Sequence, residues 1–310
     1  MKWRRTKSRD VIDVRGAPRS SGGRSGGLGG LGGGIPLPGG LAGAGGGIGL
    51  VAVVIVLAIQ FLGSDGGEGF SVDDIFGAGG SAPGVSEPQP IPPGEDPQRD
   101  LKDFSTYVFV DAQKTWAGTF RDDGEAYDEA QLVLFSGGVR TDGCGSASSA
   151  VGPFYCPADG RVHIDLSFYE EMEGELGAGG DFAWAYVIAH EMGHHVQSKT
   201  GTNAEVARLE SESPGDANEL SVRTELQADC YAGVWASTVF AEGALEPGDL
   251  DEAFTATEAI GDDRLQRRAG GSVDPDSFTH GTSEQRRTWF ENGYESGDPA
   301  ACDTFSPASV

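Results

Sequence analysis

The chain has 310 residues and a formal net charge of −26, from 48 acidic and 22 basic side chains. This length allows one good-sized domain with extensions, and the acidic balance argues against binding nucleic acid through a basic face. The charge is unevenly spread, because residues 1–25 carry a net charge of +6 and the remainder carries −32. Such asymmetry predicts a tail and a domain that face different surroundings.

An uncharged stretch follows the basic residues. No charged residue lies between Gly26 and Ser64, and residues 41–63 are apolar apart from Gln60. About 20 apolar residues are enough to cross a bilayer as a helix. A buried core helix or a cleaved signal peptide would be the alternative, but the stretch lies far from the start of the chain. We therefore predict one transmembrane helix at 41–63.

The predicted span divides the chain. Residues 1–40 are expected to form a basic, Gly-rich cytoplasmic tail, because basic residues favour the cytoplasmic side of a membrane. Residues 64–100 are rich in Gly, Pro and acids, which is typical of a disordered linker. The folded domain is expected at 101–310, on the extracytoplasmic side of the membrane.

The elements of this domain follow in chain order. Near-helical spacing of apolar residues predicts a first helix, two strands come next, and the rest of the chain is helical. The second strand alternates apolar and polar residues, which is typical of a half-exposed strand. The fold class is therefore α+β, helix-rich with a small sheet. The predicted helices are 101–120, 182–198, 217–241, 249–268 and 282–293, and the predicted strands are 130–137 and 161–169.

The sequence HEMGH, residues 190–194, lies in an apolar helix. His190 and His194 are four residues apart, so they lie on one helical face and their imidazoles can share one metal ion. Glu191 projects further round the helix, where it can reach a metal-activated water as general base. His195 is off this face and is expected to be solvated or to support the site indirectly.

The next helix carries ELQAD, residues 225–229. Glu225 and Asp229 are again four residues apart, and their neighbours are apolar, so both acids are expected to face the interior rather than solvent. Glu225 can bind zinc as a third ligand. Asp229 can accept the distal ring N–H of a zinc-bound histidine and fix its tautomer. The predicted cofactor is one Zn²⁺ per chain.

Four cysteines lie beyond the predicted span: Cys144, Cys156, Cys230 and Cys302. An even number in an oxidising compartment favours two disulfides, with three pairings possible. The short separation favours Cys144 with Cys156, which leaves Cys230 with Cys302. A cysteine zinc site would need CxxC spacing, which the sequence lacks.

These motifs together resemble the gluzincin type of zinc metallopeptidase, with HExxH followed by ExxxD. The chain is most similar to the bacterial family called putative neutral zinc metallopeptidases, including the segment 144–169 before the HEMGH helix. The resemblance covers about 101–306. It implies a zincin-like peptidase domain behind a single anchor, and hence a single-pass location in the bacterial cell membrane. It also implies that residues 161–168 form an edge strand that pairs with substrate backbone.

The resemblance extends to THGTSEQRR, residues 279–287. It implies that His280 donates to the oxyanion of the tetrahedral intermediate and that Arg286 positions the site or pairs with a carboxylate. Tyr155 and Tyr231 are alternatives for the donor role. The sequence departs from the family's pattern at Gly281, where proline is usual.

The predicted function is that of a membrane-anchored zinc endopeptidase with protein or peptide substrates and no nucleic-acid partner. The alternative is a non-catalytic, zinc-stabilised module that binds or scaffolds envelope proteins. Glu191 favours the enzyme, because a module that only binds zinc has no need of the base.

Overall fold

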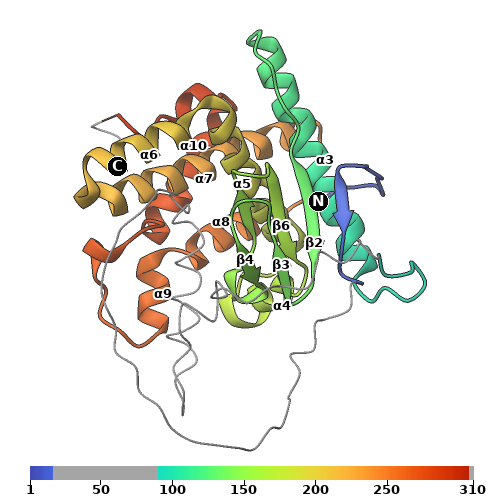
Figure 1. The fold of residues 1–310 in the computed structure, drawn as a ribbon. Coiled ribbons are helices and arrows are strands. Elements are labelled where there is room, and N and C mark those ends of the chain that lie inside the picture. Colours follow the sequence, from blue (N-terminus) through green and yellow to red (C-terminus); the bar gives the residue numbers. More distant parts are fainter. Residues whose placement is uncertain (17–89, 307–310) are drawn as a thin grey trace, which may run out of the picture.

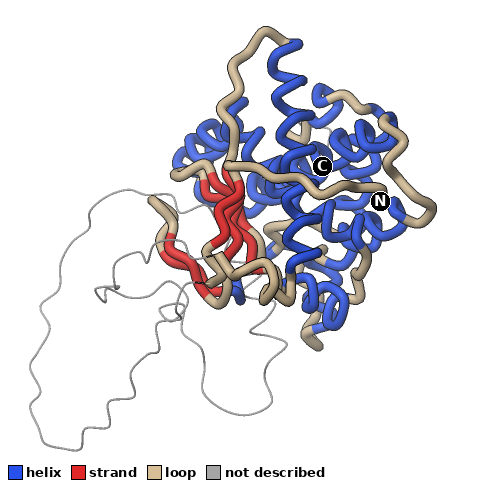
Figure 2. Tube along the Cα trace, turned by 90° about the vertical axis from the view of Figure 1, so that its right-hand side faces the viewer, coloured by secondary structure: helices blue, strands red, loops and turns tan. Residues whose placement is uncertain are grey.

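The computed structural model describes residues 1–16 and 90–306, which form a helix-rich α+β fold (Figure 1). The strands gather at one side of a larger body of helices (Figure 2). The strands are β1 (Val11–Asp13), β2 (Gln131–Phe135), β3 (Gly138–Arg140), β4 (Ser146–Ser148), β5 (Phe154–Cys156) and β6 (Arg161–Asp165). The helices are α3 (Arg99–Asp122), α4 (Phe168–Glu171), α5 (Asp181–Thr200), α6 (Thr202–Glu212), α7 (Ala217–Ala241), α8 (Asp249–Ala259), α9 (Asp262–Arg268) and α10 (Ser283–Ser296).

The fold class predicted from the sequence is confirmed in these residues, and so are the long helices. The predicted helix at 249–268 is two helices, α8 and α9, because the chain turns at Gly261. This residue packs too closely on the backbone of Ser283 to accept a Cβ atom. Helix α6 was not predicted. The short strands β1, β3, β4 and β5 were not predicted either, since segments of three residues show no periodicity.

The main sheet has the strand order β1-β2-β6-β5. Strands β1, β2 and β6 run parallel, and β5 pairs antiparallel with β6. The expectations of a half-exposed strand at 161–169 and of an edge strand at 161–168 are therefore wrong, and the strand ends at Asp165, before α4. Residues Val162–Asp165 are buried, because β6 lies between β2 and β5 and the ring of Phe154 stacks on His163 at 4.8 Å. The free edge on this side belongs to β5.

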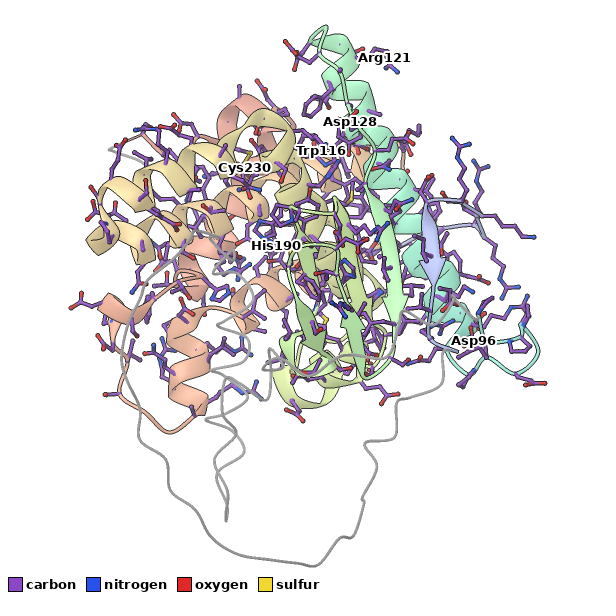
Figure 3. The ribbon with its side chains drawn as sticks, viewed as in Figure 1. Asp96, Trp116, Arg121, Asp128, His190 and Cys230 are labelled. Carbon is purple, nitrogen blue, oxygen red and sulfur yellow. A yellow bond between two sulfur atoms is a disulfide. The ribbon has the colours of Figure 1, made fainter. Side chains whose placement is uncertain are left out.

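Helix α5 is the centre of the molecule. It is buried from Phe182 to Gln197 on every face, packed among α3, α7 and α8. Figure 3 shows His190 in this central position, whereas Asp96, just before α3, and Arg121, in its last turn, lie near opposite ends of that helix. A helix that is buried all round gives its polar side chains no water, so each needs a partner.

Small residues bring α5 and α7 close together. A Cβ added to Gly193 would lie 2.9 Å from the carbonyl oxygen of Ala228 and 3.0 Å from its Cα. The middle glycine of HEMGH therefore faces the alanine of ELQAD, and neither position leaves room for a larger side chain. This contact sets the distance between the two helices that carry the predicted metal ligands.

Both predicted disulfides are confirmed. Cys144 is bonded to Cys156, which ties the β3–β4 hairpin to β5. Cys230 is bonded to Cys302, which ties the C-terminal segment to α7.

Residues 1–16 differ from the predicted separate tail, because they pack on the domain. Strand β1 is part of the main sheet, and the Met1 side chain is buried in the core. Arg15 is fully buried and makes bidentate pairs with Asp13, at 2.9 and 2.8 Å, and with Asp96, at 3.2 and 2.6 Å. Arg5 also pairs with Asp100 and Asp103, so two basic residues of this segment neutralise acids of the domain.

In the described ranges, no helix is long and apolar enough to cross a membrane. The predicted transmembrane helix at 41–63 lies outside those ranges, as does most of the predicted linker. Strand β1 pairs with β2, so residues 11–13 lie in the same sheet as the strands of the domain.

We predict that Arg15→Met destabilises the full-length chain by about 3–5 kcal/mol, because it leaves the buried carboxylate of Asp96 without its ion-pair partner and leaves Asp13 with Lys102 alone. Urea unfolding followed by circular dichroism would measure the change. The matched control is Arg9→Met, since the Arg9 side chain is 93% exposed, and it should change stability by less than about 0.5 kcal/mol. Equal stabilities of the two variants would contradict the packing of residues 1–16 on the domain.

A second prediction concerns the contact between α5 and α7. Gly193→Ala should cost about 1–3 kcal/mol, because the helices must separate to accept the methyl group. Gly118→Ala on α3 is the control, since its nearest neighbour is an arginine side chain at 3.6 Å. This control should be neutral or stabilising by up to about 1 kcal/mol. Thermal unfolding of both variants tests the contact, and a stable Gly193→Ala protein would argue against it.

Candidate metal centre

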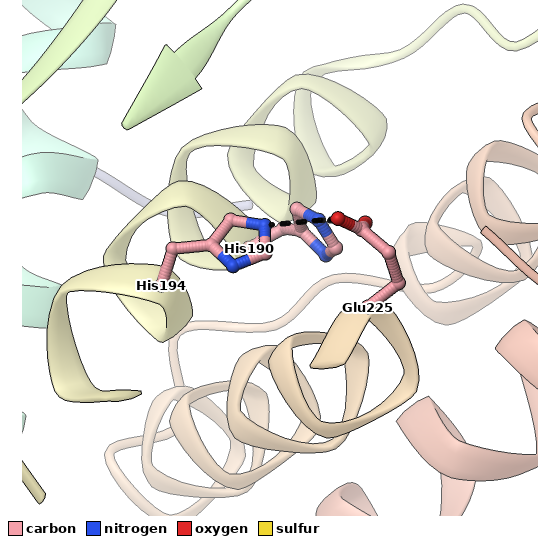
Figure 4. Close-up of side chains that lie close together, drawn as sticks. All are labelled: His190, His194 and Glu225. Atoms are coloured by element: carbon pink, nitrogen blue, oxygen red, sulfur yellow. Dashed lines mark hydrogen bonds and ion pairs between the residues drawn. The ribbon is translucent and has the colours of Figure 1, made fainter. Parts of the chain in front are cut away.

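Three side chains from two helices converge in the interior (Figure 4). His190 and His194 come from α5, and their rings lie 4.8 Å apart. Glu225 comes from α7, with one carboxylate oxygen 3.2 Å from His190 Nε2 and the other 3.5 Å from His194 Nε2. One ligand atom from each residue lies within 4.8 Å of the others. The structure thus brings together the three residues predicted to hold zinc.

Both histidines are oriented by acceptors on the far side of their rings. His190 Nδ1 donates to Asp229 Oδ1 at 2.8 Å, and His194 Nδ1 donates to Gln197 Oε1 at 2.9 Å. The Gln197 amide is itself fixed, because its nitrogen donates to Thr224 O and to Gln227 Oε1. With the proton on Nδ1, each ring directs the lone pair of Nε2 toward Glu225.

Asp229 is the meeting point of three helices. Its carboxylate accepts hydrogen bonds from His190 and Tyr186 of α5 and a bidentate pair from Arg286 of α10, at 2.8 and 3.0 Å. Arg286 is buried, and its guanidinium also lies 3.8 Å from Glu225. Burial alone would raise the pKa of Asp229, but Arg286 and His190 outweigh it and hold this pKa below its usual value. The structure gives Arg286 the carboxylate contact that was expected for it.

Glu191 faces the same space as the three converging side chains. It lines a cleft together with His190, Glu225 and His280. Its Oε2 atom is buried and has no hydrogen-bond partner among the residues that the structure describes. Burial raises its pKa, although the two histidines oppose the shift. A carboxylate that is desolvated and unpaired beside two imidazoles is placed to accept a proton from a water molecule.

The donor set fits a divalent cation. His194 Nε2 and Glu225 Oε1 are buried without a hydrogen bond in the described part of the chain, although buried polar atoms are normally paired. Burial lowers the pKa of His190, but Asp229 and Glu225 outweigh this and raise it to about 9, so the surroundings favour positive charge. Two imidazoles, one carboxylate and an open cleft are the ligand set of catalytic zinc.

His280 lines the cleft, and hydrogen bonds to Asp262 hold its backbone in place. Asp262 Oδ2 accepts the backbone N–H groups of Thr279, His280 and Gly281 at 2.8, 2.7 and 3.1 Å, and its Oδ1 lies 3.3 Å from His280 Nδ1. Gly281 has φ +87°, which proline cannot adopt because its ring fixes φ near −65°. The departure from the family's pattern therefore belongs to a turn that this chain builds with glycine.

The two alternative oxyanion donors lie elsewhere. Tyr155 donates its hydroxyl to His195 Nδ1 at 3.1 Å, while His195 Nε2 donates to the carbonyl of Asp128 at 2.9 Å. Tyr231 packs edge-on against Trp116 in a separate cluster. His195 is 1% exposed, so the expectation of a solvated ring is wrong. His195 is buried, and its hydrogen bond with Tyr155 links α5 to β5. The edge strand β5 therefore lies beside the HEMGH helix.

A second group of acids, Asp181, Asp249 and Glu252, also lies close together. The α-ammonium group of Met1 occupies this position, at 2.7 Å from Asp181 and 3.3 Å from Asp249. We therefore assign this group a structural role, which fixes the first residues of α5 and α8.

Three residues of the site were not predicted from the sequence. Gln197 follows His194 by three residues, so its position on the same helical face was a usable signal. Asp262 gave none, because it is 18 residues before His280 and meets it only through the fold of α9 and the turn that precedes α10. Tyr186, four residues before His190, had the right spacing but reads as a core aromatic.

Comparison with known proteins agrees with this geometry. The family model described as "Putative neutral zinc metallopeptidase" matches residues 1–305. The uncharacterized protein YpfJ of Escherichia coli strain K12 is 45% identical over 309 residues, which cover 98% of this chain and 99% of that protein. The uncharacterized protein Mb2605 of Mycobacterium bovis is 48% identical over 195 residues, 59% of this chain and 65% of that protein.

No solved structure shows a significant match. The family match begins at the first residue, which agrees with the packing of residues 1–16 on the domain. It also includes the HEMGH helix, the ELQAD helix and the turn at His280. On this evidence the chain belongs to the family of putative neutral zinc metallopeptidases.

Proposed function

We propose that the protein is a zinc endopeptidase that hydrolyses peptide bonds, with Glu191 as general base. The observation that carries the proposal is the convergence of His190 Nε2, His194 Nε2 and Glu225 beside the unpaired carboxylate of Glu191. Membership of a zinc metallopeptidase family supports it. The competing function, a zinc-stabilised binding module, would not require a desolvated carboxylate facing the same cleft.

We propose that His190, His194 and Glu225 hold one Zn²⁺ per chain. Zinc, when bound, lowers the pKa of a coordinated water toward neutrality and polarises a carbonyl group. Asp229 and Gln197 keep both imidazoles in the tautomer that exposes Nε2. Arg286 holds Asp229 in place and compensates its charge.

The proton path uses the chain's own groups. Glu191 takes a proton from the attacking water and returns it to the nitrogen of the leaving amine. His280 donates a hydrogen bond to the carbonyl oxygen as negative charge develops on it. Asp262 positions His280 through its backbone and its ring. The low exposure of these groups, 6% for both Glu191 and His280, strengthens each electrostatic contact.

The substrate backbone is proposed to lie along β5. This strand is the free edge of the main sheet, and Pro153, directly before it, lines the cleft. An extended peptide can add to such an edge through main-chain hydrogen bonds. The role that the family resemblance assigned to residues 161–168 thus moves to β5, because β6 is already paired on both sides.

We propose that residues 41–63 attach the protein to the bacterial cell membrane. The two disulfides favour an extracytoplasmic domain. Since β1 belongs to the sheet, residues 1–16 would lie on that same side, which fits a segment that enters and leaves the membrane on one side and does not fit a single crossing. Arg5 and Arg15 are then partners of domain acids, not signals for the cytoplasm.

Metal content and cleavage test the proposal. In the full-length protein, Glu191→Gln should retain one zinc per chain and lower the rate of casein cleavage about 10²–10⁴-fold, since a general base typically contributes this much. His194→Ala should lose the zinc, because only His190 and Glu225 remain as ligands. Elemental analysis and gel-based cleavage assays provide both readouts.

The control is Glu205→Gln, an exposed acid of α6 that does not line the cleft, and it should retain both zinc and cleavage. Zinc in the parent protein without cleavage of any peptide would support the binding module instead. A parent protein that takes up no zinc would overturn the ligand assignment.

A further prediction separates His280 from Asp262. His280→Ala should lower kcat about 10²–10³-fold with little change in KM, because an oxyanion donor acts mainly in the transition state. Asp262→Asn should lower kcat less, since the histidine stays in place but loses its oriented acceptor. An effect confined to KM would show that His280 binds substrate only.

A further inference from the structure

The cleft beside the metal centre has an apolar wall. Helix α4 and the single π-helical turn that follows it, Met172–Leu176, form one side, and α5, α8 and α9 supply the rest. Met172 and Leu176 are 3% and 7% exposed, so their side chains are packed in place. The main apolar side chains of the wall are Phe168, Met172, Leu176, Val187, Ile260 and Leu265.

Two carboxylates interrupt this wall. Glu171 and Glu175 both line the cleft, one turn apart, and Glu171 is half-buried. In the described part of the chain Glu171 has no hydrogen bond or ion pair, and its one electrostatic neighbour is the like charge of Glu175. Burial, followed by repulsion from Glu175, raises the pKa of Glu171. An acid in this position is left without compensation by the protein itself.

No cationic side chain that lines the cleft is paired with Glu171. Arg286 lines it, but its guanidinium is held in a bidentate pair by Asp229 and is 1% exposed. His190 and His280 are bound to Asp229 and Asp262. The proposed zinc would be held by His190, His194 and Glu225. Among the described residues of the cleft no further cation remains, so a side chain that enters from solvent can supply the positive charge that Glu171 lacks.

We propose that this cleft binds the substrate side chain next to the scissile bond and selects lysine or arginine, with Glu171 as the specificity-determining residue. The inference rests on the proposed peptidase function and names its substrate class. Lysine and arginine bury an apolar stem and keep a charged head. The stem matches the wall of Met172, Leu176 and Leu265, and the head pairs with Glu171 in a charge-assisted hydrogen bond.

The test uses full-length protein and a peptide pair that differs only in lysine or norleucine. Norleucine keeps a straight apolar stem and lacks the charge. Cleavage sites in casein, mapped by mass spectrometry, first show which position beside the scissile bond to vary. The parent protein should cleave the lysine peptide with a kcat/KM about 10–100-fold higher, the range expected of a hydrogen bond to a charged group.

Glu171→Gln should bring this ratio to about one. The matched control is Glu173→Gln, an exposed acid of the same turn that does not line the cleft, and it should keep the parent's ratio. Calorimetric titration of the same peptides into Glu191→Gln protein should give a preference in Kd for the lysine peptide, which Glu171→Gln removes when added to that protein.

Failure of the specificity and failure of the peptidase function give different results. Cleavage of both peptides at equal rates by the parent, or a ratio that Glu171→Gln leaves unchanged, would overturn the specificity and leave the peptidase function intact. Neither cleavage nor binding of any peptide would overturn the proposed function and the specificity with it.

Discussion

The site depends on the hydrogen bonds that the carboxylate of Asp229 accepts. This carboxylate accepts hydrogen bonds from Tyr186 and His190 of α5 and from Arg286 of α10, while its own backbone belongs to α7. Removing any one partner would leave polar groups exposed to an apolar interior, where they are costly. The same contact sets the tautomer of His190, so the packing of three helices and the chemistry of one ring share one cause. Cys230 follows directly and anchors the C-terminal segment at this turn.

Helical spacing made most of the metal centre predictable from the sequence. Two pairs of residues at four-residue intervals, on helices too apolar to face solvent, leave few ways to arrange their side chains. The sequence also indicates that the two helices lie close together, because Gly193 and Ala228 are the small residues of the two motifs. The contact between His280 and Asp262 could not be predicted, since it forms only through a turn whose conformation depends on Gly281.

The sheet and the N-terminal segment were harder to predict, for two different physical reasons. Strand β5 has three residues, and nothing in so short a segment says that it covers the edge of β6. In residues 1–16 the charge was visible, but charge has two explanations. Basic residues can mark the cytoplasmic side of a membrane, or they can neutralise acids nearby. Arg15 between Asp13 and Asp96 shows the second explanation, and only the tertiary structure distinguishes the two.

Electrostatics also links the stability of the fold to its function. Glu191, Glu225 and Asp229 place three carboxylates in the interior against one guanidinium, that of Arg286. When His190 is neutral, as a metal ligand must be, one negative charge is left over even with Glu191 protonated. A cation that binds only the folded state then stabilises that state by mass action. The residues that hold these acids together therefore work against repulsion: the Arg286 pair, the Gly193–Ala228 contact and the Cys230–Cys302 bond. None of them needs to touch the cation, and together they keep its site assembled before it arrives.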